Sequence, residues 1–285
     1  MTKKYGALLV CFFVSLFVFA MDWPVREGRL IANFGSNDAG IPLLGNSFAA
    51  AGPVYAADVG KLIFVRDPEH PSSQLPSPLG SWLAVDHGDN MVGIYSRYEE
   101  NHSAQIPTMV EKSTVLASAG SSGWAKQSGL YFAIFDRRER RWVNPQVLIA
   151  GIEDTTPPVI RQVELRSTGG TPYNPAVIQR IPQGLYSVFV DASDIISGGE
   201  SLTPNRISCS INGAEAGTLS FETLVSRQGK RMVYRNGIKD AAGVYDPRGF
   251  GLGEIRLNRG QAAMVIEASD MAGNSRSVTY RLTID

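Results

Sequence analysis

Cysteine and histidine are both scarce in this chain of 285 residues. The two cysteines are Cys11, within an apolar N-terminal run, and Cys209. If export removes that run, no intrachain disulfide can form, so stability must come from apolar cores. The three histidines are His70, His87 and His102. No two of them are two or four residues apart, which excludes the usual paired-histidine spacings of a zinc site.

An excess of charge of either sign is also missing. The chain has 27 Lys and Arg residues and 27 Asp and Glu residues, so its formal net charge is zero. Proteins that bind nucleic acid through its phosphates normally carry a basic excess or a basic stripe. We therefore predict that nucleic acid is not a partner.

Long hydrophobic runs are limited to the N-terminus. Lys3 and Lys4 precede an apolar run over residues 7–20, which is short for a membrane span and ends at the small residue Ala20. This pattern predicts a secretory signal peptide over residues 1–20, no membrane span after its removal, and a periplasmic or other cell-envelope location. An uncleaved anchor and a lipid on Cys11 remain alternative interpretations.

The rest of the chain has the pattern of an all-β protein. Short apolar and aromatic runs end at Gly, Asp, Asn or Pro, as strands and turns do. Residues 151–158 end in Asp-Thr-Thr-Pro-Pro and are predicted to be a stiff linker between an N-terminal domain, 21–150, and a C-terminal domain, 159–285. Seven strands in the second domain indicate a β-sandwich. The predicted strands cover residues 29–34, 54–57, 61–65, 82–86, 92–95, 129–135, 159–165, 184–192, 206–211, 218–224, 253–257, 262–268 and 277–284.

Several N-terminal stretches carry a family resemblance. Residues 80–88 read GSWLAVDHG and lead into IYSRY at 94–98, while GLYFAIF at 129–135 is followed by WVNP at 142–145. Upstream lie GNSFAA at 45–50 and GPVYAADVGKLIFV at 52–65. Together, over about residues 28–145, these stretches resemble the M23 (LytM or lysostaphin-like) zinc endopeptidases of peptidoglycan. The resemblance implies an antiparallel β-sheet domain with a substrate groove.

The resemblance places the family's functional positions on residues with a different chemistry. The first two zinc ligands fall on Leu43 and Ser47, the catalytic histidine on Arg97, and the paired histidines of the last motif on Gly129 and Tyr131. A catalytic zinc needs about three N, O or S donors and an open position for the water that it activates. Leucine and glycine have no side-chain donor, and a neutral hydroxyl is a poor one.

We therefore predict a degenerate M23 domain with no catalytic residue, no bound metal and no other cofactor. Tyr131 is expected to fill the vacated metal position. For Arg97 two interpretations stay open: it binds carboxylates in the groove, or it is a solvated residue at the rim.

In the C-terminal domain, TPPVI at 156–160 and IEASDMAGN at 266–274 resemble bacterial immunoglobulin-like or fibronectin-III-like modules. Two near-repeats, VDASD at 190–194 and IEASD at 266–270, each end a predicted strand. Their Asp191, Asp194 and Asp270 are interpreted either as calcium ligands or as caps of the turns that follow. The frequency of such caps favours the turns.

Three functions follow from these patterns. A retained scaffold with lost ligands favours a noncatalytic cell-envelope module that binds peptidoglycan or regulates a cell-wall hydrolase such as an amidase. The first alternative is a zinc endopeptidase of peptidoglycan with an unconventional metal site, drawn from His87, His102 and Asp86. The second is a structural or adhesion protein of the envelope that binds through its immunoglobulin-like domain.

Overall fold

The computed structural model describes residues 21–66, 75–99, 106–196, 199–236, 238–240 and 243–285. Across these residues the chain forms strands β1 to β25 and a single four-residue helix, α1 (Pro145–Leu148), so the predicted all-β class is confirmed. No helix in the described part of the chain is long and apolar enough to cross a membrane. The predicted signal peptide, His70 and His102 lie outside the described residues.

The N-terminal half is built on antiparallel strands around β11, which pairs with β8 on one side and with β4 and then β12 on the other. The residues of β11, GLYFAIFD, are buried along nearly their whole length, as an uninterrupted apolar run in a central strand predicts. The strands of this half are β1 (Arg29–Ala32), β2 (Asn37–Asp38), β3 (Ile41–Pro42), β4 (Asn46–Ala49), β5 (Pro53–Tyr55), β6 (Gly60–Val65), β7 (Ser81–Asp86), β8 (Met91–Tyr98), β9 (Met109–Val110), β10 (Val115–Ser118), β11 (Gly129–Asp136) and β12 (Arg141–Val143).

The C-terminal half is a sandwich of two sheets. One sheet has the order β14-β13-β16-β23-β22 with β17 beside β16, and the other runs from β15 through β25, β24 and β18 to β19, with β20 and β21 beyond it. Alternate residues of the two sheets, among them Val188 and Val190 from one and Cys209 and Ile266 from the other, share one apolar core. The strands are β13 (Val159–Ser167), β14 (Pro172–Tyr173), β15 (Arg180–Ile181), β16 (Gly184–Ile195), β17 (Ser201–Leu202), β18 (Arg206–Ile211), β19 (Ala214–Arg227), β20 (Lys230–Arg235), β21 (Ile238–Asp240), β22 (Tyr245–Asp246), β23 (Gly249–Leu257), β24 (Gly260–Ser269) and β25 (Ser275–Ile284).

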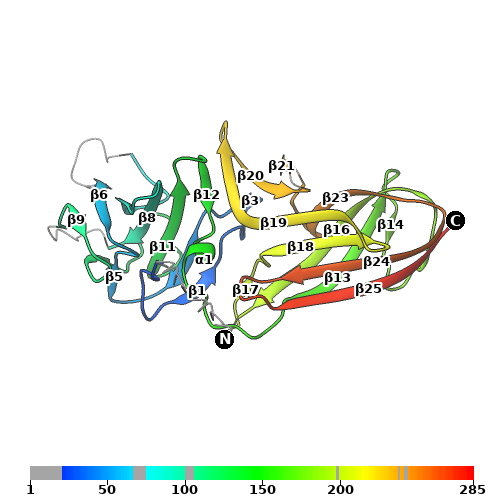
Figure 1. Cartoon of the computed structure of the whole chain (residues 1–285), viewed down its shortest axis with the longest axis horizontal. Coiled ribbons are helices and arrows are strands. Elements are labelled where there is room, and N and C mark those ends of the chain that lie inside the picture. Colours follow the sequence, from blue (N-terminus) through cyan, green and yellow to red (C-terminus); the bar gives the residue numbers. More distant parts are fainter. Residues whose placement is uncertain (1–20, 67–74, 100–105, 197–198, 237, 241–242) are drawn as a thin grey trace, which may run out of the picture.

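The two halves share a sheet. Strand β12 pairs with the second half of β19, with Trp142 opposite Leu224, so the sheet of the N-terminal half continues into one layer of the sandwich. Figure 1 shows the halves side by side along the long axis, with β19 bending from the sandwich toward β12. Phe34 and Leu44 of the N-terminal half belong to the core of the sandwich, and Leu202 belongs to the core of the N-terminal half.

The contact between the halves is close at Gly35. A Cβ atom at this position would lie 2.3 Å from the ring of Phe221, and Gly35 has a φ of +80°. The Tyr245 hydroxyl donates a hydrogen bond to the Gly35 carbonyl. Nearby, the Asn33 amide donates to the Thr203 carbonyl over 2.7 Å and accepts from the Thr203 N–H over 3.0 Å. Glycine is needed here because the backbone is left-handed and packs directly against an aromatic ring.

Each predicted strand overlaps an observed one, but some observed elements have no signal in the sequence analysis. Strand β4 contains the buried polar residues Asn46 and Ser47, and of its four residues only Phe48 has a strong intrinsic β preference. Pairing with β1 and β11 on its two sides holds it in the sheet. Helix α1 begins at Pro145 after an Asn144 cap, a start signal that the Asn-Pro pair does carry.

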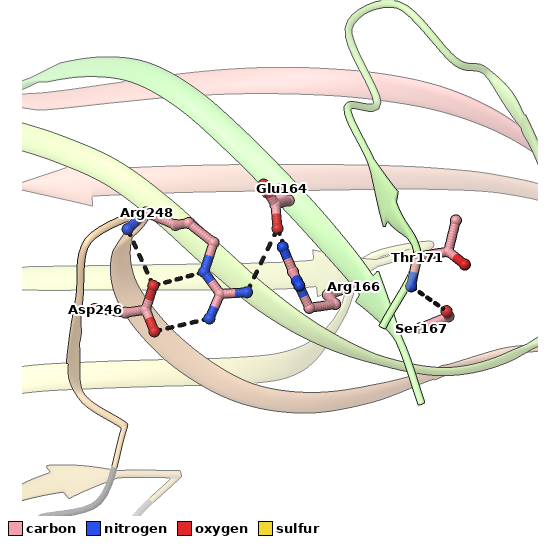
Figure 2. A network of polar contacts seen from close by, with 6 residues as sticks. All are labelled: Glu164, Arg166, Ser167, Thr171, Asp246 and Arg248. Carbon is pink, nitrogen blue, oxygen red and sulfur yellow. Dashed lines mark hydrogen bonds and ion pairs between the residues drawn. The ribbon is translucent and has the colours of Figure 1, made fainter. Parts of the chain in front are cut away.

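A network of charges holds the turn between β22 and β23 against β13 (Figure 2). The Arg248 guanidinium binds both carboxylate oxygens of Asp246, over 2.5 and 2.7 Å, and approaches Glu164 to 3.5 Å. Arg166 reaches the same Glu164 over 3.1 Å. The hydrogen bonds from Arg248 lower the pKa of Asp246. Each carboxylate in this network therefore has a cation beside it.

Candidate functional site

A groove opens beside β1, β4, β8 and the start of β11. Its volume is about 220 Å³, and four of the five positions predicted from the family resemblance line it: Leu43, Ser47, Arg97 and Gly129. The fifth, Tyr131, lies next to it and contacts Arg97. Residues from three separate stretches of the sequence are thus brought together at one place, which we call the groove.

The position of Tyr131 is set by pairing on both sides. It lies opposite Ser47 of β4 and opposite Ser96 of β8. Its side chain is only 6% exposed, and its hydroxyl accepts a hydrogen bond from the Leu44 N–H over 3.1 Å. Burial, partly offset by the charge of Arg231, raises the pKa of Tyr131 to about 12. The phenol is therefore neutral and already used as an acceptor.

Arg97 is directed toward the groove by a bulge in β8. Ser81 and Trp82 are neighbours on β7 but pair with Tyr98 and Ser96, so Arg97 is the extra residue, and its φ is +68°. Such bulges re-aim a side chain at the cost of a strained backbone. The guanidinium carbon lies 4.9 Å from the centre of the Tyr131 ring. The Nε atom is buried and has no hydrogen-bond partner among the described residues.

The backbone of the neighbouring strand packs directly against Gly129. A Cβ atom at this position would lie 1.8 Å from the carbonyl oxygen of Phe48 on the neighbouring strand. Because that atom belongs to a paired backbone, it cannot move aside as a flexible side chain would. No side chain, and so no metal-binding side chain, fits at Gly129 with the strands in this arrangement.

The described residues around the groove offer few of the donors that zinc prefers. Its lining includes one carboxylate, Asp38, and no histidine, cysteine or glutamate. Sequence reasoning did not select Asp38, or the exposed Trp124 and Lys126, which also line the groove. Trp124 follows the small-residue stretch 117–123, and a large aromatic residue after such a stretch is a signal in the sequence that was overlooked.

The alternative metal site drawn from His87, His102 and Asp86 is tested only in part, because His102 is outside the described residues. Both ring nitrogens of His87 are within hydrogen-bond distance of protein atoms, the Tyr95 hydroxyl at 3.0 Å and the Val59 carbonyl at 3.1 Å. Burial lowers the pKa of His87. Asp86 pairs with Arg137 over 2.6 Å. In this arrangement His87 braces the β7–β8 hairpin.

A group of carboxylates lies elsewhere, at the junction of the two halves. The side chains of Asp154, Asp194 and Asp270 place carboxylate oxygens within 4.8 Å of one another. Asp191, the other acid of the near-repeats, instead pairs with Arg161 over 3.1 Å. Asp270 caps its turn as expected, since it accepts a hydrogen bond from the Asn274 N–H over 2.9 Å.

Comparison with known proteins gives partial matches. A protein-family model matches residues 157–285. No curated protein matches the chain. Similar solved structures include the catalytic domain of the prophage-encoded M23 protein EnpA from Enterococcus faecalis, at 21% identity and a TM-score of 0.36, with coverage of 45% of this chain and 95% of that one.

Two further solved structures are similar over the same share of the chain. A zinc-containing peptidase from Vibrio cholerae is 22% identical with a TM-score of 0.37, over 47% of this chain and 41% of that one. The SpoIIQ–SpoIIIAH pore-forming complex gives 17% identity and a TM-score of 0.37, over 46% of this chain and 90% of that one. This chain thus spans less than half of the Vibrio structure. Likeness at this level is no evidence for what this chain binds.

Proposed function

We propose that the N-terminal half is a noncatalytic, M23-like module of the cell envelope that binds peptidoglycan in the groove. One observation carries the proposal. The five positions at which the family resemblance places metal ligands and a catalytic histidine gather around the groove, and none supplies a nitrogen, thiolate or carboxylate ligand. Without such ligands no metal-bound water is available to attack a peptide bond.

The groove has groups that suit a peptidoglycan strand. The Arg97 guanidinium lines the groove and is a binding group for the carboxylates of stem peptides. Lys126 adds a second cation on the groove lining. Trp124, which is 72% exposed, offers a flat apolar surface to a sugar ring. A carboxylate-bearing ligand with sugar faces matches this combination of charge and aromatic surface.

Co-sedimentation of the purified protein with sacculi tests the proposal. We expect binding that persists in EDTA, with no release of muropeptides. Arg97→Asn removes the guanidinium but keeps a residue that tolerates a left-handed φ, and Trp124→Ala removes the ring. Each is expected to weaken binding about tenfold. Arg138→Ala is the matched control, because Arg138 is 72% exposed on the β11–β12 hairpin and pairs only with Glu139 among the described residues.

Each other outcome points to a different function. Release of muropeptides by the native protein would contradict a noncatalytic role and favour the endopeptidase alternative. Sacculus binding that both groove variants leave unchanged would move recognition to the C-terminal half, as the adhesion alternative requires. Retention of a purified amidase without any binding to sacculi would replace peptidoglycan by a cell-wall hydrolase as the partner.

A further inference from the structure

We propose that Asp154, Asp194 and Asp270 form a calcium site at the junction of the two halves, together with the amide oxygens of Gln146 and Asn205. The five side chains line one small cavity of about 20 Å³, which is room for a single particle the size of a water molecule or an ion. They come from five separate segments: α1, the 151–158 segment, the end of β16, the residue before β18 and the turn after β24.

Three of the residues that line this cavity each have a side-chain oxygen without a hydrogen-bond partner among the described residues. Asp194 is only 5% exposed, and its Oδ1 is buried with no hydrogen-bond partner among the described residues. The same holds for Oδ1 of Asn205 and Oε1 of Gln146. A buried polar atom without a partner is costly, and three of them around one cavity is unusual. All three atoms are acceptors. A single cation can bind all three together, whereas another acceptor can bind none of them.

The charges around the cavity favour a cation as well. Three carboxylates meet there, and no Lys or Arg is among the described residues that line it. The network of Figure 2 shows the contrast, because there each of Asp246 and Glu164 has an arginine beside it. Burial and the neighbouring Asp270 and Asp154 raise the pKa of Asp194 to about 7, as expected for a carboxylate without a counter-charge.

The donor set selects the kind of cation. Carboxylates and amide oxygens are hard ligands, which Ca²⁺ takes in sets of six to eight with flexible geometry, whereas Mg²⁺ requires a near-ideal octahedron and gives up its waters reluctantly. Zinc prefers nitrogen and sulfur ligands. Among the described residues, no His or Cys side chain lines the cavity. Five protein side chains from separate segments, with water completing the shell, fit calcium best.

A cation at this position would link the 151–158 segment to both halves of the molecule. Asp154 belongs to the segment predicted as a linker, and the Asp154 carbonyl already accepts a hydrogen bond from the Asn274 side chain over 3.0 Å. A cation held by Asp154, Asp194, Asp270 and Gln146 would fasten this segment to the sandwich and to α1 of the N-terminal half. The site would therefore fix how the two halves are placed.

Thermal unfolding and calorimetric titration of the full chain with CaCl₂ test the proposal. At pH 8, a calcium concentration about 100-fold above Kd is expected to raise Tm by roughly 5–10 °C relative to EDTA. Asp194→Asn removes one charged ligand and is expected to weaken calcium binding at least about tenfold. In EDTA this variant should unfold at or above the native Tm, because it relieves repulsion among the carboxylates, so loss of binding is separable from loss of folding.

Asp191→Asn is the matched control. Asp191 belongs to the same near-repeat but lies outside the cluster and pairs with Arg161, so calcium affinity should equal that of the native protein. The proposal is overturned if calcium gives the native protein no shift in Tm and no heat of binding, or if both variants bind calcium as tightly as the native protein. An equal shift with MgCl₂ at the same concentration would overturn the assignment to calcium.

Discussion

The groove of the N-terminal half and the cavity at the junction are opposites in their chemistry. The groove lies where the family resemblance places a zinc ion, yet Leu43 and Gly129 offer no donor and a Cβ atom at Gly129 would strike the Phe48 carbonyl. The junction cavity lies where turn caps were expected, yet Asp194 and Asn205 leave oxygen atoms there without partners.

The difference shows that a metal site is defined by its donors and not by the scaffold around them. Strands β4, β8 and β11 hold Ser47, Arg97, Gly129 and Tyr131 close together at the groove. At the junction no single strand defines the site, and segments distant in sequence supply the oxygens.

The largest effect is expected when a metal-binding residue is introduced into the groove. Gly129→His is expected to destabilise the protein by about 3 kcal/mol or more, because its Cβ must displace the paired backbone of β4, and not to restore zinc binding. Urea unfolding measures the loss. Leu43→His, at a partly exposed position on the groove lining, should cost about 1 kcal/mol or less. Full stability of Gly129→His with one bound zinc would refute the account of the groove.

A second test measures how tightly the two halves pack against each other at Gly35. Gly35→Ala should cost about 3 kcal/mol, because the added Cβ meets the Phe221 ring and the φ is +80°. Gly40→Ala has a similar φ of +84° with nothing within 4 Å, so it isolates the backbone term at about 1 kcal/mol. Equal losses in the two variants, measured by urea unfolding, would mean that the halves do not press on one another at Gly35.

The expectation that Tyr131 occupies the position of a metal in the M23 resemblance can be tested by removing its hydroxyl. Tyr131→Phe removes the acceptor of the Leu44 N–H and leaves that buried group unpaired, which is expected to cost about 1–2 kcal/mol. Tyr280→Phe is the control, because the Tyr280 hydroxyl has no hydrogen bond among the described residues and its ring is partly exposed. Its loss should be near zero. If Tyr131→Phe were equally neutral in chemical denaturation, Tyr131 would not be a structural replacement for the metal.

The smallest expected effect is a pH dependence at His87. Burial lowers the folded-state pKa of His87, so the unfolded chain takes up its proton first as the pH falls. The contribution of His87 to stability is therefore complete above pH 6.5 and is lost progressively as the pH falls below that value. Urea midpoints at several pH values, compared between the native protein and His87→Gln, measure the contribution. A steeper loss in the variant would contradict it.

Sequence patterns predicted the fold class because apolar strands such as β11 and β16 carry their own periodicity and turn signals. The five groove positions were predicted from the family resemblance, and four of them, Ser47, Arg97, Gly129 and Tyr131, lie on the paired strands β4, β8 and β11. The burial of the Arg97 Nε without a partner could not be predicted, because it depends on a bulge that only the pairing of β7 and β8 defines.

The junction cavity was beyond the sequence for a similar reason. The near-repeats pointed to Asp191, Asp194 and Asp270 as a set, but strand geometry turns Asp191 toward Arg161 and brings in Asp154 from the predicted linker. Asn205 and Gln146 carry no motif at all. Their meeting depends on how β12 joins β19 and on how the halves pack, which local patterns do not encode.

The most direct test of the central claim is the metal content of the purified protein after equilibration with calcium and zinc together and then desalting. We predict about one calcium per chain in the native protein, loss of that calcium in Asp194→Asn, and no zinc in either. One zinc per chain, retained by both proteins, would place a metal outside the junction cavity and contradict a noncatalytic groove.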